Sequence, residues 1–258
     1  MKNFSKSEFN EVWENLRFFV KSLARIKNSR FLELSEKSFC VDTCFDSASE
    51  NWVFYSEKLN QNDVFKIVEF FGSREFIFPI YGEPENSELE ILEKSGLKHA
   101  GNLLAMNFNP EKAKYDFKTD FVIADNDSLL KEWAETSLRG FEVEFETLPE
   151  EFLNLALSFR NDDKNIIPVI SKTNDVNCGS FLIAKSKIEN KEISGIYYFS
   201  VIPEYRRHGI AREMMNFASE LSNKIVLQAT PSGIPFYKNV GFKELFEIKI
   251  FSKSDDIF

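Results

Sequence analysis

The first part of the chain alternates between helical and strand-like spacing of its hydrophobic residues. From residue 5 to residue 25, apolar side chains recur every three or four positions, which predicts an amphipathic helix. Short apolar runs bounded by polar residues predict strands at 31–44, 51–56, 76–80 and 103–108. Helices are predicted between them at 64–71 and 87–94, with Gly96 placed to end the second.

The second part repeats this alternation in a different order. It predicts a strand at 121–124, helices at 129–138 and 149–159, and three successive strands at 166–171, 179–186 and 193–202. A helix at 211–222, a strand at 225–229, a short helix at 235–239 and a strand at 244–251 complete it. This order is typical of a mixed α/β fold.

A polar stretch that contains Pro110 separates the two parts. The sequence therefore predicts a first domain at 1–110, a linker at 111–118 and a second domain at 119–258. A short pattern also recurs on both sides of this linker. Strand 76–80, a helix and the run from Lys94 to Lys98 parallel strand 225–229, a helix and the run from Asn239 to Lys243.

Composition narrows the function classes. The net charge of −9 argues against general nucleic-acid binding, which needs a basic surface. Three cysteines and two histidines, without metal-ligand spacing, argue against a metal site or a disulfide framework. The chain shows no signal-peptide pattern and no apolar run long enough for a membrane span. We expect a cytoplasmic protein that binds neither nucleic acid nor membrane and is a monomer or a homodimer.

The most informative stretch is YFSVIPEYRRHGIAR, from Tyr198 to Arg212. A strand ends at Pro203, and a basic loop then leads into a helix. Backbone N–H groups and the helix dipole make such a junction an anion site. Gly209 allows close approach of a phosphate, and Ala211 keeps the first helical turn narrow. A diphosphate matches this arrangement.

The run RRHGIA resembles the Arg/Gln-x-x-Gly-x-Gly/Ala signature of the GNAT acetyltransferase superfamily. Downstream, LQATPSG and PFYKNVGF resemble the second conserved segment of that family. The resemblance covers about 140 residues of the second domain. It implies a GNAT acyl-CoA N-acyltransferase fold with a mixed β-sheet, in tandem with a degenerate GNAT-like first domain.

The family lays CoA between two parallel strands that move apart, and it transfers the acyl group directly to an amine. The resemblance implies acetyl-CoA as acyl donor, without a metal, and Tyr237 as the general acid that protonates the departing thiolate. A backbone N–H near 199–201 would stabilise the oxyanion. The implied acetyl-CoA-binding residues are Phe199, Ser200, Val201, Arg206, Arg207, His208, Gly209, Ile210, Ala211, Arg212 and Thr230.

Two positions depart from the family pattern. Some members carry a glutamate, acting as a base through water, near the start of the strand before the signature. Here residues 194–198 read SGIYY, without a carboxylate, so the base is not identified. Thr230 stands where many members have an asparagine that contacts pantetheine, and its hydroxyl can still donate and accept.

The loop after the first helix of the second domain borders the acceptor site in this family. Its residues Glu142, Glu144 and Glu146, together with Tyr197, are candidates for binding a small, cationic amine, although an acidic, solvated loop is an equally good interpretation. Two other functions stay open. One is a CoA-binding regulatory protein without turnover, and the other is acetylation of protein amines.

Overall fold

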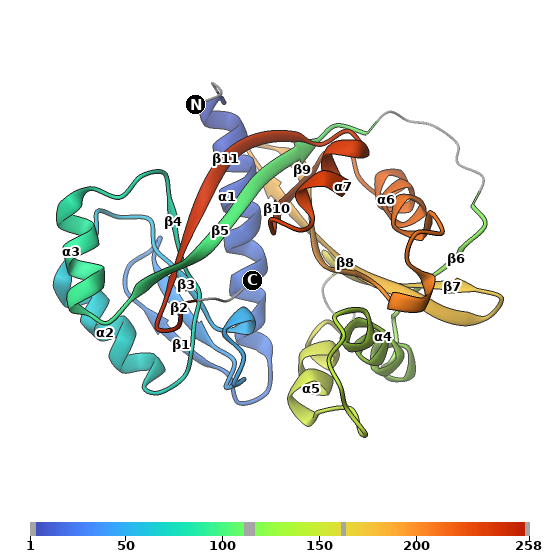
Figure 1. Cartoon of the computed structure of the whole chain (residues 1–258), viewed down its shortest axis with the longest axis horizontal. Coiled ribbons are helices and arrows are strands. Elements are labelled where there is room, and N and C mark those ends of the chain that lie inside the picture. Colours follow the sequence, from blue (N-terminus) through green and yellow to red (C-terminus); the bar gives the residue numbers. More distant parts are fainter. Residues whose placement is uncertain (1–3, 111–116, 161–163, 256–258) are drawn as a thin grey trace.

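The computed structural model describes residues 4–110, 117–160 and 164–255 (Figure 1). The predicted alternation of helices and strands is confirmed along both parts of the chain. The first part contains α1 (Lys6–Ser22), β1 (Arg30–Glu33), β2 (Phe39–Asp42), β3 (Trp52–Phe54), α2 (Gln61–Phe71), β4 (Phe78–Tyr81), α3 (Asn86–Lys94) and β5 (Lys98–Phe108).

The second part contains the helices and strands that carry the predicted site. They are β6 (Asp120–Ile123), α4 (Asp127–Gly140), α5 (Glu150–Ser158), β7 (Ile166–Thr173), β8 (Val176–Ile188), β9 (Lys191–Val201), α6 (Ile210–Glu220), β10 (Ile225–Ala229), α7 (Ile234–Asn239) and β11 (Lys243–Ser252). The predicted linker 111–118 lies mostly outside the described residues.

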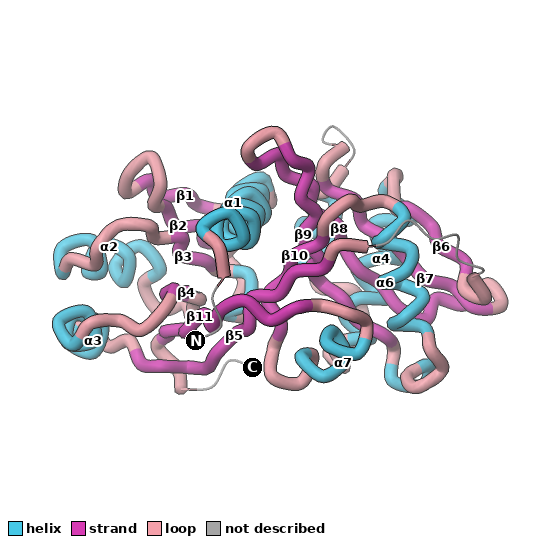
Figure 2. The backbone as a smooth tube through the Cα atoms, turned by 90° about the horizontal axis from the view of Figure 1, so that it is seen from above, coloured by secondary structure: helices cyan, strands magenta, loops and turns pink. Residues whose placement is uncertain are grey.

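A single mixed sheet runs through both parts of the chain in the order β4-β11-β5-β10-β9-β8-β7-β6. The last strand of the first part, β5, lies between β10 and β11 of the second part, and β11 in turn pairs with β4 of the first part (Figures 1 and 2). The two strand–helix–strand units thus exchange their last strands. The proposed boundary near residue 110 divides the sequence, whereas the sheet is shared.

The two exchanged units end their helices in the same way. After α3, Gly96 has φ +77° and Leu97 donates to the carbonyl of Leu92. After α7, Gly241 has φ +103° and Phe242 donates to the carbonyl of Tyr237. Both are Schellman endings, which need a residue with positive φ and therefore favour glycine. This likeness is what a duplicated unit would give, and the degenerate repeat stays a prediction.

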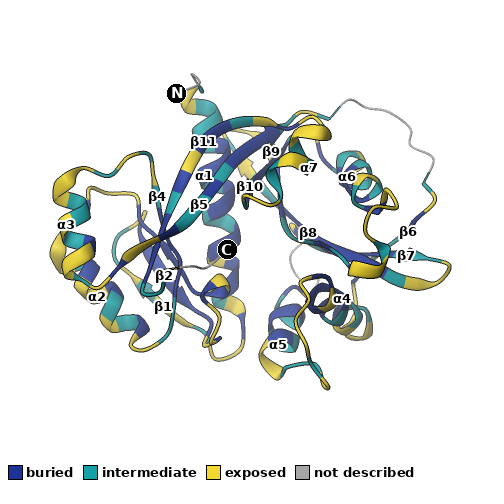
Figure 3. Cartoon of the chain, in the orientation of Figure 1, coloured by how far each residue is buried: buried dark blue, intermediate teal, exposed yellow. Residues whose placement is uncertain are grey.

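Helices cover both faces of the large sheet. On one face, α6 and α7 enclose a core with Phe181, Met214, Ile225 and Phe242. On the other face, α1, α4 and α5 share a core that draws on both parts of the chain, as burial along the ribbons shows (Figure 3). In the described residues, no helix is both long and apolar enough to span a bilayer.

Helix α1 fastens the first part of the chain to the second. Its N-terminus is held by a capping box between Ser5 and Glu8. The carboxylate of Glu11, 3% exposed, forms ion pairs with Lys191 and Lys224 at the starts of β9 and β10. Because one buried carboxylate contacts both strands, α1 is fixed over the point where they meet.

Candidate functional site

The centre of the site is the place where parallel strands β9 and β10 separate. They pair only through Ser194 with Ile225 and Gly195 with Val226. Beyond these pairs, β9 continues to Val201 and β10 to Ala229. The predicted acetyl-CoA residues Phe199, Ser200 and Val201 lie on the separated part of β9. Within the described part of the chain, no strand pairs with the edge that faces β10 there.

A bulge in β9 divides the residues of this strand between the two faces of the sheet. Tyr198 has φ +49°, and the register with β8 shifts at this point. The ring of Tyr198 consequently packs with the α1, α4 and α5 core, whereas the ring of Phe199 packs with the α6 and α7 core. An uncommon positive φ in a non-glycine residue marks a strained position, and such positions cluster at functional sites.

Tyr237 lies over the separated part of β9. Its ring centroid is 6.1 Å from that of Phe199 and 5.4 Å from that of Phe242. Its backbone is fixed by the α7 ending described above. Burial raises the pKa of the Tyr237 hydroxyl above its usual value, so the group is protonated at neutral pH and can act as an acid.

The basic loop leads into an open helix N-terminus. Gly209, with φ +87°, is the N-cap residue of α6 and has no side chain to cap it. Among the described residues, none supplies a backbone acceptor to the N–H groups of His208, Gly209, Ile210 or Ala211. Residues 206–209 are exposed, and Arg207 adopts φ +65°. This arrangement of free N–H groups and positive charge is suited to a phosphate.

The helix at the matching position in the first part is closed. Helix α2 follows β3 as α6 follows β9, but the side chain of Asn60 accepts from the N–H of Asp63 and caps it. Asp63 also places a negative charge in the first turn. A capped and acidic N-terminus disfavours an anion. This agrees with the prediction that the first part lacks a phosphate loop.

The side chain of Arg206 points to the acceptor loop. It donates from Nε to the carbonyl of Val201 (3.0 Å), from one terminal nitrogen to Glu142 (2.5 Å) and from the other to the carbonyl of Gly140 (2.8 Å). The guanidinium therefore joins the end of β9 to the end of α4. The backbone N–H of Arg206 donates to the carbonyl of Pro203 (3.1 Å), so both its guanidinium and its N–H have partners within the protein.

The acidic loop is less uniform than its sequence indicates. Glu142 adopts φ +60°, so the alternation of Phe and Glu is not that of an extended strand. Glu144 and Glu146 border a shallow hollow that also contains Lys131 and Arg139. Of the three predicted carboxylates, Glu142 is thus paired with Arg206, and the other two share their surface with basic side chains.

Tyr197 is bound to the first part of the chain. Its hydroxyl donates to Oδ1 of Asn15 (2.9 Å), and its ring stacks on Phe19 with centroids 3.7 Å apart. Asn15 is fully buried, and its Nδ2 donates to the carbonyls of Ala184 and Ile193. A Cβ at Gly195 would overlap Oδ1 of Asn15. The strand therefore has no room for a glutamate at this position.

The remaining predicted residues lie around the same junction. Ser200 packs so closely against α4 that a Cβ at Gly140 would overlap its hydroxyl. Thr230 directly follows β10, and its carbonyl accepts from Gly233 at the start of α7. Asn15 was not identified from the sequence. The sequence signal that could have identified it is its position on an apolar helix face, among Val12, Leu16 and Phe19.

Comparison with known proteins supports the resemblance in sequence and in fold. Residues 167–244 match the family model described as an acetyltransferase (GNAT) domain, and this segment of the chain is such a domain. No curated protein matches the chain in sequence.

Three solved structures show a similar fold over most of the chain. A GCN5-related N-acetyltransferase from Kribbella flavida has 8% identity and a TM-score of 0.62, covering 93% of this chain and 95% of its own. A functionally unknown conserved protein from Staphylococcus epidermidis has 14% identity and a TM-score of 0.58, covering 88% and 95%. A GCN5-related N-acetyltransferase from Sphaerobacter thermophilus has 12% identity and a TM-score of 0.53, covering 86% and 82%. The predicted GNAT fold with a mixed sheet is confirmed.

Proposed function

We propose that this protein transfers acetyl directly from acetyl-CoA to a primary amine of a small molecule. The observation that carries the proposal is the separation of β9 from β10 beside the uncapped N-terminus of α6. The loop N–H groups and basic side chains would bind the diphosphate, and the free edge at 199–201 would bind pantetheine. A thioester laid along this edge would pass beneath Tyr237.

The proposed reaction is attack of the amine nitrogen on the thioester carbonyl. A backbone N–H of the separated strand would stabilise the oxyanion, and the Tyr237 hydroxyl would give its proton to the departing sulfur. The raised pKa of Tyr237 keeps that proton available in the ground state. We assign no role to a metal.

The test is release of free thiol from acetyl-CoA in the presence of spermidine, kanamycin and lysine methyl ester. Amine-dependent release supports the proposal, and binding of acetyl-CoA without release would favour the CoA-binding regulatory protein. Acetylation of a lysine peptide, with none of the three small amines, would favour a protein substrate.

We propose the acidic loop as the part that attracts a cationic acceptor. Glu144 and Glu146 are exposed, and Glu142 is held beside the end of β9 by Arg206. Changing all three to Gln should raise the acceptor KM without changing the acetyl-CoA KM. An unchanged acceptor KM would leave this loop as a solvated surface.

A further inference from the structure

Glu50, in the first part of the chain, is a buried carboxyl that the proposed mechanism does not yet use. It lies at the end of a short 3-10 turn, Ala48–Glu50, just before β3, and is 6% exposed. Among the described residues no lysine or arginine forms an ion pair with it. Its carboxylate accepts from the hydroxyls of Ser49 and Ser47 and from its own backbone N–H.

A buried carboxyl without a cation is costly to the fold, and proteins seldom keep one without a use. Burial raises the pKa of Glu50 and outweighs the hydrogen bonds that would lower it. A raised pKa makes the carboxylate a better proton acceptor near neutral pH. A positively charged group that bound beside Glu50 would therefore stabilise its charged form.

The loop that carries Glu50 is held rigidly. Asn51, fully buried, accepts from the N–H of Thr43 (3.0 Å) and donates to the carbonyls of Phe45 (2.9 Å) and Glu75 (2.9 Å). At the other end, Nε1 of Trp52 donates to the carbonyl of Ser49 (2.7 Å). Glu50 is thus fixed between two braced neighbours.

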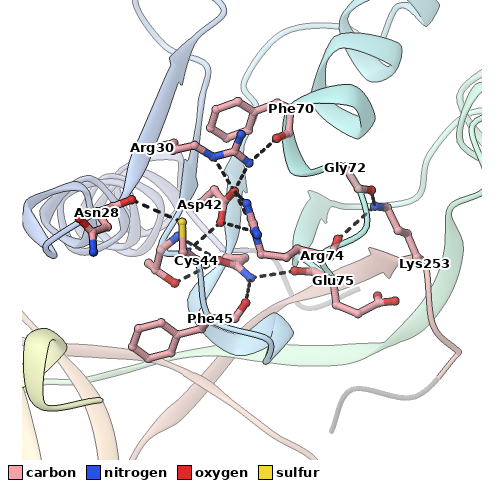
Figure 4. A network of polar contacts seen from close by, with 12 residues as sticks. Asn28, Arg30, Asp42, Cys44, Phe45, Phe70, Gly72, Arg74, Glu75 and Lys253 are labelled. Carbon is pink, nitrogen blue, oxygen red and sulfur yellow. Dashed lines mark hydrogen bonds and ion pairs between the residues drawn. The ribbon is translucent and has the colours of Figure 1, made fainter. Parts of the chain in front are cut away.

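A second network holds the start of this loop. The fully buried Asp42 accepts from Arg30 and Arg74, and its Oδ1 accepts from the N–H of Cys44 (Figure 4). Lys253 donates to the carbonyls of Gly72 and Arg74 and ties the end of the chain to the same network. The carboxylate of Asp42 is thus paired with two guanidinium groups, whereas Glu50 accepts from hydroxyls and from its own backbone N–H.

The loop that carries Glu50 lies near Tyr198, the residue at the bulge in β9. Phe45 lies 6.4 Å from Phe152 between ring centroids, and Phe152 lies 6.2 Å from Tyr198. Burial raises the pKa of the Tyr198 hydroxyl, and the negative charge of Glu50 adds to this effect. Tyr198 keeps intermediate exposure although rings surround it. The loop that carries Glu50 therefore lies near Tyr198 where the two parts of the chain join, on the face of β9 opposite Tyr237.

Resting on the proposed function, we propose that Glu50 binds the ammonium group of the acceptor and takes its first proton. Asn15 leaves no room for a carboxylate at Gly195, in the stretch where some members of the family carry one, and Glu50 supplies a carboxylate from the first part of the chain. The acceptor would approach from the α1, α4 and α5 face, opposite the leaving thiol.

The proton balance of this mechanism is complete. Glu50 takes one proton from the ammonium group and passes it to solvent, which frees the nitrogen lone pair. The N–C bond forms and the C–S bond breaks. Tyr237 gives its proton to sulfur and is reprotonated by the second proton that nitrogen loses, so the products are an amide, CoA thiol and one proton.

The test compares E50Q with the control E57Q. Glu57 also accepts from two serine hydroxyls, those of Ser35 and Ser38, but it is exposed. With spermidine, kanamycin or lysine methyl ester, E50Q should lower kcat/KM at least about 100-fold, and E57Q should change it less than about threefold. Both variants should keep the stabilisation by acetyl-CoA, and E50Q should melt no lower than the wild type.

If the wild type is active and E50Q turns over within about threefold of it, the inference is overturned. The proposed function is then left intact. A wild type that acetylates none of the three amines would contradict the proposed function instead. Melting then decides the role of Glu50: a melting temperature several degrees below the wild type marks a structural carboxyl and overturns the inference. An equal or higher value supports a carboxylate kept for a cation.

Discussion

The carboxamide of Asn15 occupies the space that a side chain at Gly195 would need. Asn15 belongs to the first part of the chain, and Gly195 lies at the last paired position of β9 before the strands separate. The same carboxamide accepts from Tyr197 and donates to two strand carbonyls. One buried contact thus joins the two parts and leaves no room for a side chain at Gly195.

This contact predicts a strong coupling between the two positions. G195A should destabilise the protein by about 1–3 kcal/mol, because the new methyl group overlaps a fixed polar side chain. N15A alone should also destabilise, since it leaves strand carbonyls and the Tyr197 hydroxyl without their partner. The free energies of unfolding in urea should be markedly non-additive, with the double variant more stable than the sum predicts. Additive values would show that the two residues do not compete for space.

The position of Tyr237 predicts that removal of its hydroxyl lowers turnover without weakening the binding of acetyl-CoA. Y237F should lower kcat about 100-fold, in the range expected for removal of a general acid, and should leave the acetyl-CoA thermal shift unchanged. Because burial raises the pKa of Tyr237, wild-type turnover should show no fall from tyrosine ionisation up to about pH 9. The control is Y81F, a partly exposed tyrosine that packs on Phe4 and Phe9. Equal turnover of Y237F and Y81F would remove Tyr237 from the mechanism.

The contacts of Arg206 predict that its replacement affects the acceptor amine more than the binding of acetyl-CoA. Because its guanidinium is engaged with Val201, Gly140 and Glu142, R206A should lower kcat/KM for the acceptor about tenfold by loosening the loop. The thermal shift by acetyl-CoA should stay close to that of the wild type. R207A, at an exposed residue of the same loop, is the matched control and should reduce the acetyl-CoA shift more than R206A does. The reverse order would place the Arg206 side chain on the diphosphate.

The sequence was sufficient for most helices and strands and for the glycine at the start of α6, because each depends on local spacing. A strand, a glycine with positive φ and a helix start follow one another within the loop at Gly209, and the α7 ending at Gly241 is equally local. The exchange of β5 and β11 could not be predicted, since either strand satisfies the same hydrophobic pattern. Asn15 and Glu50 could not be identified from the sequence either, because their contacts depend on which distant strand the first part packs against.

The most direct test of the account is thermal unfolding with and without 1 mM acetyl-CoA for the wild type, G209E and G82E. Gly82 has φ +78° and open space around it, so G82E imposes a similar backbone strain away from the site. A ligand that binds only the folded protein raises its melting temperature. The account predicts a clear rise for the wild type and G82E and none for G209E. No rise in the wild type, or an equal rise in all three proteins, would contradict an acetyl-CoA site at the start of α6.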